Sequence, residues 1–278
     1  MRLALRMANA CNKDHALHQN DARSALSEVL EYDRAITEVV LPLAGDQALV
    51  VGASDHGTGG LSLGQSFISP SPREAVVGYA WYPSVLVGQD GSIHEQLFGL
   101  EFWDPIKHLS IDDLLQKVKD RIKEKVKLPG DRGHPVLIGD ELRKKFMDPN
   151  KWEEKDFKDV ESSLRYFIAN ECEKLGVSED DCIGGVVKSK MLQDDVYSDA
   201  DAFKVAVGRL IANKAGLSFG TRGHTSTDIN LYCNTPRDRH SSVCKGTCST
   251  TRLASACVLL LACPASRNCS SLMRQFRL

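Results

Sequence analysis

The segment from Asp21 to Gly60 constrains the fold most, because it places a helix, a strand and a glycine-rich turn in direct succession. Asp21 is a good N-terminal cap for a helix. The apolar residues after it recur at helical spacing, namely Leu26, Val29, Leu30, Ile36 and Val40. A proline and a glycine then end the helix, and residues 48–51 form a short buried strand that runs into polar, glycine-rich residues 54–60. This order is typical of an α/β protein with a site at the carboxyl end of a strand.

The rest of the chain also alternates between helical and strand patterns. Residues 66–105 are rich in proline, glycine and serine and are expected to form surface loops. Ser110 and Asp113 resemble a capping box at the start of an amphipathic helix, and two similar helices follow. Their apolar positions are Leu114, Leu115, Val118, Ile122 and Val126, then Leu164, Phe167, Ile168, Cys172 and Leu175, then Phe203, Val207, Leu210 and Ile211. Residues 229–232 have the pattern of a further strand.

Charge and hydrophobicity argue against two classes of partner. The 278 residues carry a formal net charge of -2, which gives no reason to expect attraction to nucleic acid or to a membrane surface. The longest apolar run lies within residues 253–263 and is shorter than the roughly 20 residues that span a bilayer. Residues 1–6 lack the apolar stretch of a signal peptide. We therefore expect no nucleic-acid partner, no membrane segment and no targeting segment in this sequence.

Three clusters of polar residues can carry chemistry. The first, DHALH, places Asp14 and His18 one helical turn apart, where they can hold a divalent metal such as zinc. Its alternative is a solvated helix face. In the second, Asp55 and His56 end the predicted strand, and the glycines beside them let both turn toward one ion; a salt bridge would satisfy them equally well. The third contains His224, which alone would be an ordinary loop residue.

In this order, the three clusters resemble the alkaline phosphatase family. The stretch DHALHQND from Asp14 resembles the metal-binding helix of that family, and DHGTGGL from Asp55 resembles its second metal motif. The sequence GHT from Gly223, followed by Asp-Ile, resembles the third motif. The sequence WYP from Trp81 is similar to eukaryotic, especially fungal, members. The resemblance covers about residues 14–232 and corresponds to the C-terminal half of the family.

The resemblance implies a fold and a domain organisation. The chain would form part of a three-layer α/β sandwich, in which helices cover both faces of a central, mostly parallel sheet, with the N-terminal half absent. Residues 1–13 match nothing in the family, and residues 14–236 correspond to its C-terminal region. Residues 239–278 contain no acidic residue and no regular hydrophobic period. We therefore expect residues 237–278 to form an irregular or disordered tail.

Roles for five residues also follow from the resemblance. Asp14, His18 and His224 would bind a first zinc ion, and Asp55 and His56 a second. In the family the two ions clamp the phosphate of a monoester substrate. One activates a serine, which becomes phosphorylated, and the other holds the leaving oxygen and then supplies a hydroxide. Family members also bind magnesium, act in extracellular, vacuolar or periplasmic spaces and are compatible with a homodimer.

Several residues of the family pattern have no counterpart in this chain. No Asp-Ser-Ala sequence is present, so neither the serine nucleophile nor the phosphate-binding arginine is assigned. The early aspartate of the second zinc site is missing as well. Asn9 stands where the family has a magnesium-binding glutamate, and Gly57 replaces a usual acidic residue. We expect a first zinc site with all its ligands, an incomplete second site and a lost magnesium site.

The expected function is therefore zinc-dependent hydrolysis of phosphate monoesters through a phosphoserine intermediate, by family, in a truncated chain that is inactive alone. Two alternatives remain open. One is another enzyme of the same superfamily, such as a cofactor-independent phosphoglycerate mutase, which the sequence Asp55-His56-Gly57 also suits. The other is a non-catalytic zinc-binding fragment.

Overall fold

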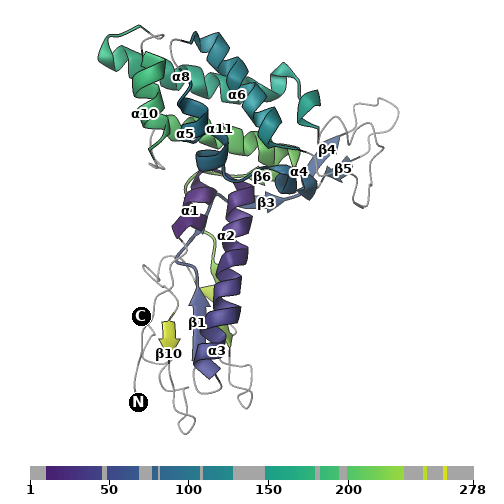
Figure 1. The fold of residues 1–278 in the computed structure, drawn as a ribbon. Coiled ribbons are helices and arrows are strands. Elements are labelled where there is room, and N and C mark those ends of the chain that lie inside the picture. Colours follow the sequence, from purple (N-terminus) through teal and green to yellow (C-terminus); the bar gives the residue numbers. More distant parts are fainter. Residues whose placement is uncertain are drawn as a thin grey trace. The chain divides into compact units, whose positions relative to one another are not determined.

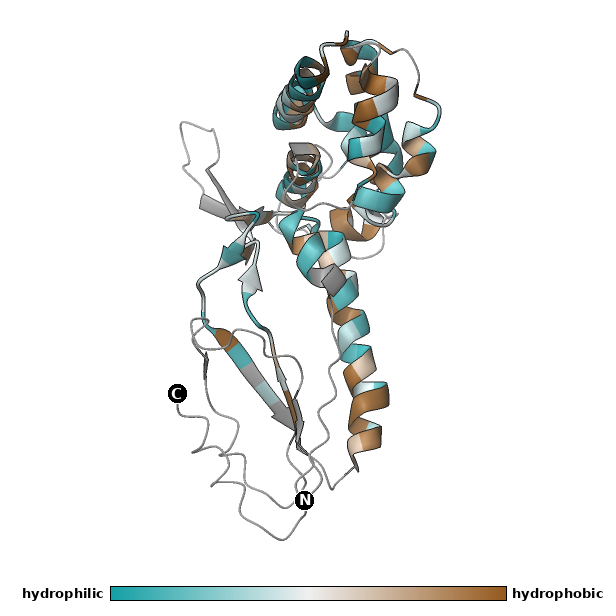
Figure 2. Ribbon diagram, turned by 90° about the vertical axis from the view of Figure 1, so that its left-hand side faces the viewer, coloured by the Kyte–Doolittle hydropathy of each residue, from teal (hydrophilic) through white to brown (hydrophobic). Residues whose placement is uncertain are grey.

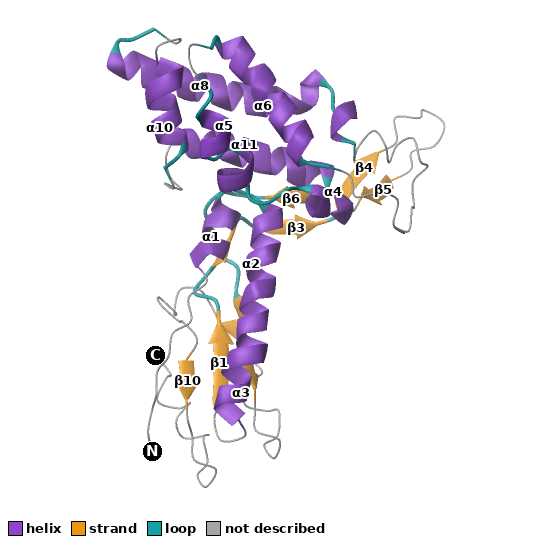
Figure 3. Ribbon diagram, in the orientation of Figure 1, coloured by secondary structure: helices purple, strands orange, loops and turns teal. Residues whose placement is uncertain are grey.

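The computed structural model (Figure 1) describes residues 11–45, 49–68, 77–80, 82–106, 109–127, 148–178, 182–193, 199–234, 247–248 and 259–261. The chain divides into two compact units. The first unit comprises residues 1–14, 27–60 and 223–278, and the second comprises residues 15–26 and 61–222. Helices make up most of the second unit (Figure 3), which we call the helical unit. Among the described residues, no helix has the length and hydrophobicity needed to cross a membrane.

Helix α1 (Cys11–His18) and helix α2 (Ala22–Ala35) open the described chain, and Asp21 lies between them. The predicted cap is confirmed: Oδ1 of Asp21 accepts from the Ser24 backbone N–H at 3.1 Å, and Oδ2 accepts from the Ser24 hydroxyl at 2.8 Å. The same buried carboxylate accepts two further hydrogen bonds, from Gln89 Nε2 at 3.1 Å and from the Ile93 backbone N–H at 2.8 Å. Asp21 therefore joins the start of α2 to residues 89–93 of the helical unit.

We expect Asp21→Ala to destabilise the helical unit by about 2–4 kcal/mol, because the cap is lost and buried donors are left without an acceptor. Urea unfolding followed by circular dichroism measures this change. Ser24→Ala is the matched control, since it removes only the hydroxyl bond of the same group. An Asp21→Ala protein that unfolds at the same urea concentration as the original chain would contradict the prediction.

In the first unit, α2 continues into the π-helical η1 (Ile36–Val40) and into α3 (Leu41–Ala44). Gly45 follows with a φ of 54°, so the chain leaves the helix at the predicted glycine. The predicted proline, Pro42, does not end the helix, because it lies in the first turn of α3. The apolar positions of this helix are more exposed than its spacing suggests: Leu30 is 58% exposed and Leu43 82%.

Strand β1 (Leu49–Ala53) confirms the predicted strand and lies inside a four-stranded sheet. Its partners are β8 (Ile229–Asn234) and β10 (Leu259–Leu261), and β9 (Thr247–Cys248) pairs with β8. The strand order is β10-β1-β8-β9, with Val51 opposite Cys233. Strand β8 also confirms the strand predicted over residues 229–232. Most of the tail predicted for residues 237–278 lies outside the described residues.

The predicted mostly parallel central sheet is not formed by the strands that the structure describes. Each of their pairings is antiparallel. Parallel neighbours need a crossover that returns the chain to the same edge of the sheet, usually through a helix. Here, the described helices that follow β1 all lie between β5 and β6, and β6 pairs with β3 rather than with β1. What the structure shows is a mostly helical chain with small antiparallel sheets.

Besides parts of α1 and α2, the helical unit contains two short strand pairs and ten helical segments among its described residues. Strand β3 (Leu61–Leu63) pairs with β6 (Leu217–Phe219), and β4 (Gln65–Ile68) pairs with β5 (Val77–Ala80). The helical segments are α4 (Pro83–Gly88), η3 (Ile93–Leu97), α5 (Leu100–Trp103), α6 (Ile111–Lys125), η4 (Pro149–Lys151), η5 (Glu154–Phe157), α8 (Lys158–Leu175), η6 (Ile183–Val187), α10 (Lys188–Met191) and α11 (Asp199–Lys214).

The expectation of surface loops over residues 66–105 is wrong. This stretch holds β5, α4, η3 and α5, together with most of β4. Pro83 is compatible with a helix because it occupies the first turn, where no backbone donor is needed. Apolar side chains then attach the short helices to the core: Phe98 and Trp103 are fully buried, and the Trp103 indole donates to the Phe98 carbonyl at 2.9 Å.

The three predicted amphipathic helices are confirmed as α6, α8 and α11. The Ser110 hydroxyl caps α6 by accepting from the Asp113 backbone N–H at 3.2 Å. Stretches of hydrophobic and hydrophilic residues alternate along helices of the unit in Figure 2, as expected for helices with one buried face. Their apolar sides form one core with Phe98 and Trp103. A disulfide between Cys172 and Cys182 joins α8 to the start of η6.

Candidate metal centre

The first predicted cluster lies on α1, which confirms that Asp14 and His18 share a helix. His18 belongs to the helical unit and is almost fully buried. Its Nδ1 donates to the Arg222 carbonyl at 2.5 Å. Histidines that bind metals through one ring nitrogen usually donate the other to such a carbonyl. The observed bond therefore orients His18 in a way that suits ligation through Nε2.

Asn20 supports the same region of the helical unit from the turn between α1 and α2. It adopts a left-handed conformation with a φ of 54°, which asparagine tolerates better than most residues. Its Nδ2 donates to the carbonyls of Leu17 at 2.9 Å and Thr221 at 3.0 Å, and its Oδ1 accepts from Arg209 at 2.9 Å. The side chain thus ties the segment that precedes His224 to the turn after α1.

The second and third clusters meet in a two-stranded ladder of the first unit. Asp55 and His56 follow β1 and lead into β2 (Gly57–Thr58), which pairs antiparallel with β7 (His224–Thr225). Thr58 lies opposite His224, and the Gly59 backbone N–H donates to the Gly223 carbonyl at 3.0 Å. Residues opposite each other in an antiparallel pair share a face, as do residues two apart in a strand. The ladder therefore directs His56, Thr58 and His224 to one side.

Glycine at position 57 leaves room for the side chains of Thr225 and Thr227. A Cβ atom there would overlap the Thr225 hydroxyl and lie 3.1 Å from Thr227 Oγ1. A larger residue there would require the Thr225 side chain to shift. The family usually has an acidic residue at this position, and the glycine found here fits the local packing of this chain.

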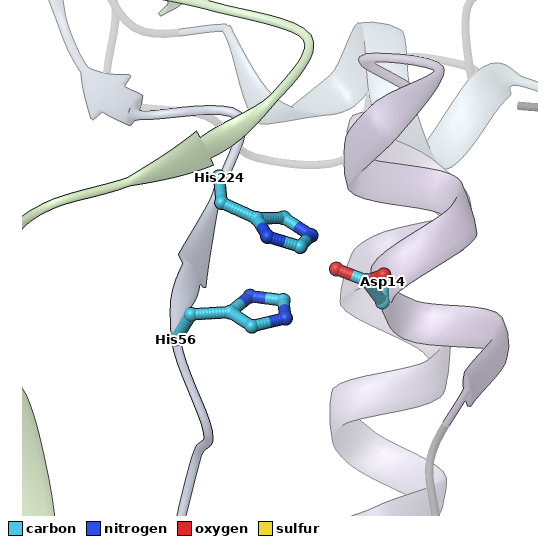
Figure 4. Close-up of side chains that lie close together, drawn as sticks. All are labelled: Asp14, His56 and His224. Atoms are coloured by element: carbon cyan, nitrogen blue, oxygen red, sulfur yellow. The ribbon is translucent and has the colours of Figure 1, made fainter. Parts of the chain in front are cut away.

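Asp14, His56 and His224 converge on one point (Figure 4). One ligand atom from each lies within 4.8 Å of the other two. The two imidazole rings stack, with centroids 3.5 Å apart and planes inclined by 22°. Asp14 faces the rings from α1, and both rings project from the ladder. Asp14 and His56 are half-buried, and His224 is exposed.

Hydrogen bonds connect these side chains to their neighbours. The Thr58 hydroxyl donates to Asp14 Oδ1 at 2.6 Å and lies 3.1 Å from His56 Nδ1. On the other edge of the His56 ring, Nε2 lies 3.3 Å from Asp55 Oδ2. The His56 backbone N–H also donates to Asp55 Oδ1 at 3.1 Å. Asp55 is thus placed directly beside one ring nitrogen of His56.

The donor set of this group suits a divalent metal. Two imidazoles and a carboxylate are typical protein ligands of zinc, and three such ligands leave an open position for a substrate or water. The three residues come from both predicted ligand sets, since Asp14 and His224 belong to the first and His56 to the second. The division of the five predicted ligands between two ions stays a prediction. Asn9, the predicted replacement of the magnesium ligand, lies outside the described residues.

Thr58 is the residue of this group to which the sequence reasoning gave no role. Its motif was recognised, but only the neighbouring Asp55 and His56 were considered as ligands. The spacing of the two residues could have indicated this role, because a hydroxyl two residues after His56 in an extended segment lies on the same face as the imidazole.

Comparison with known proteins agrees with this picture. A model of the family described as alkaline phosphatase matches residues 7–96, which include four of the five predicted ligands. The chain is 24% identical over 229 residues to the repressible alkaline phosphatase of Saccharomyces cerevisiae. That match covers 81% of this chain and 30% of the relative, so the chain spans less than a third of the yeast protein. No solved structure shows a significant match. Residues 7–96 of the chain thus match the alkaline phosphatase family.

Proposed function

We propose that this chain is the metal-binding part of a phosphate monoester hydrolase and that it binds zinc through Asp14, His56 and His224. The observation that carries the proposal is the convergence of three side chains from three separate sequence clusters within 4.8 Å. Each cluster alone has an ordinary explanation, such as a solvated helix face or a salt bridge. A shared metal centre explains why an exposed imidazole, a second imidazole and a carboxylate meet.

Asp55 and His18 complete the proposed ligand set. The 3.3 Å between Asp55 Oδ2 and His56 Nε2 is the spacing of two donors on one tetrahedral zinc ion, about 3.3 Å for bonds of about 2.0–2.1 Å. This distance supports a second ion on Asp55 and His56. The bond from His18 Nδ1 to a carbonyl supports His18 as a zinc ligand that binds through Nε2.

Zinc bound here would supply positive charge to a phosphate group and would lower the pKa of a bound water. The residues of the chain hold the donor atoms in place. Half-buried Asp14 and His56 hold their donor atoms on the inner side of the group, and exposed His224 lies where a substrate can approach. The short ladder fixes both imidazoles on one backbone frame. This arrangement suits the binding of a phosphate monoester.

Counting metal ions per chain by native mass spectrometry tests the proposal. We expect the metal-free protein to take up one zinc ion per chain at stoichiometric zinc, because one predicted site has all its ligands. Two ions at higher zinc would show that Asp55 and His56 complete a second site. No zinc adduct under conditions that preserve the fold would overturn the proposal and leave a family member without a working metal centre.

A further inference from the structure

We infer that Thr58 is a positioning residue that links two ligands of the metal centre and selects the nitrogen with which His56 binds; this inference rests on the proposed zinc site. Thr58 is 8% exposed and lies between a carboxylate and an imidazole. It contacts Asp14 on one side and His56 on the other. The three side chains form a hydrogen-bonded chain across the inner side of the site.

The direction of this chain follows from counting protons. The Thr58 hydroxyl has a single proton, and its 2.6 Å distance to Asp14 Oδ1 is that of a hydroxyl donating to an ionised carboxylate. The hydroxyl oxygen can then only accept from His56 Nδ1, 3.1 Å away. His56 must therefore carry a proton on Nδ1.

A proton on Nδ1 determines how His56 can bind an ion. A neutral imidazole with this proton has its lone pair on Nε2, which is the nitrogen beside Asp55 Oδ2. The same hydroxyl fixes one oxygen of Asp14 and so limits rotation of that carboxylate. Thr58 also lies opposite His224 in the β2–β7 ladder. Thr58 thus contacts Asp14 and His56 and pairs with His224, so it is linked to all three ligands of the group.

Zinc affinity in a set of four variants tests this role, with competition against a chromophoric chelator as the measurement. Thr58→Val removes the hydroxyl at nearly constant shape and should weaken zinc binding about 10–100-fold, as the loss of such outer partners generally does. Thr58→Ser keeps the hydroxyl and should bind within about 3-fold of the original chain. Thr58→Ala provides the same deletion without a branched side chain, in case Thr58→Val folds poorly. Thr227→Val is the control, because its hydroxyl bonds to Thr225.

Nitrogen-15 NMR of the zinc-loaded protein gives a second readout. The His56 ring should show a protonated Nδ1 and a metal-bound Nε2 in the original chain and in Thr58→Ser. In Thr58→Val or Thr58→Ala, the Nδ1 proton should exchange faster with water, because its acceptor is gone. Unchanged affinity and an unchanged Nδ1 signal in both deletions would overturn the role of Thr58 while leaving the zinc site intact. If the original chain binds no zinc, the metal centre is wrong, and the role of Thr58 with it.

Discussion

Replacing His224 by alanine should lower the zinc affinity of this chain by more than about 100-fold, since loss of an outer hydrogen-bond partner alone costs 10–100-fold. Asp14→Asn and His56→Ala should have effects of the same order, because each removes one of the three donors that lie within 4.8 Å. The chelator competition described above measures all three affinities. An equal loss in three variants from distant stretches of sequence would be the signature of one shared metal centre.

His15→Ala is the matched control for this series. His15 lies on α1 next to Asp14 but does not belong to the converging group, so its removal should leave the zinc affinity unchanged. Two further variants test how the ligands are divided between two zinc ions. His18→Ala should weaken the first ion, and Asp55→Asn should abolish uptake of the second. Retention of full affinity in His224→Ala would show that the group does not bind the metal.

Turnover of p-nitrophenyl phosphate by this chain, with zinc and magnesium added, should fall at least about 10,000-fold below that of the yeast relative. Loss of a catalytic nucleophile commonly costs this much or more. The physical reason is that no serine in an Asp-Ser-Ala context is present to attack the phosphorus. A bound zinc ion without that serine can hold a phosphate group but forms no phosphoserine.

The control for the turnover assay is the His224→Ala protein purified in parallel. Residual turnover that is equal in both preparations comes from a contaminating phosphatase. Turnover close to that of the yeast relative, present in the original chain and lost in His224→Ala, would contradict the prediction. It would show that another group of this chain acts as the nucleophile.

Local features of the fold could be predicted from the sequence because they depend on neighbouring residues. Asp21 caps α2 and Ser110 caps α6, as their short polar side chains predict. Spacing of apolar residues gave the amphipathic helices, and an apolar run gave β1. The second function of Asp21, as acceptor for Gln89 and Ile93, could not be predicted because those partners are distant in sequence.

Features that depend on distant pairing were predicted less well. Composition predicted loops over residues 66–105 because it does not reveal the burial of Phe98 and Trp103, which stabilises short helices there. The direction of strand pairing was wrong because an apolar run is compatible with parallel and antiparallel partners. The metal-binding residues could be named from motifs, yet the meeting of Asp14, His56 and His224 required the register of β2 with β7.

The β3–β6 pair has a consequence for how the ladder forms as the chain folds. Between the two halves of the ladder lies an insertion of roughly 160 residues, 61–222, and closing so long a flexible loop would cost about 4.5 kcal/mol of chain entropy. Once the helical unit has folded, β3 and β6 hold Leu61 opposite Phe219, and that loop is already closed. The two histidine-bearing segments then need to search only a short distance. Zinc uptake after dilution from denaturant would therefore lag behind helix formation and report the last step of folding.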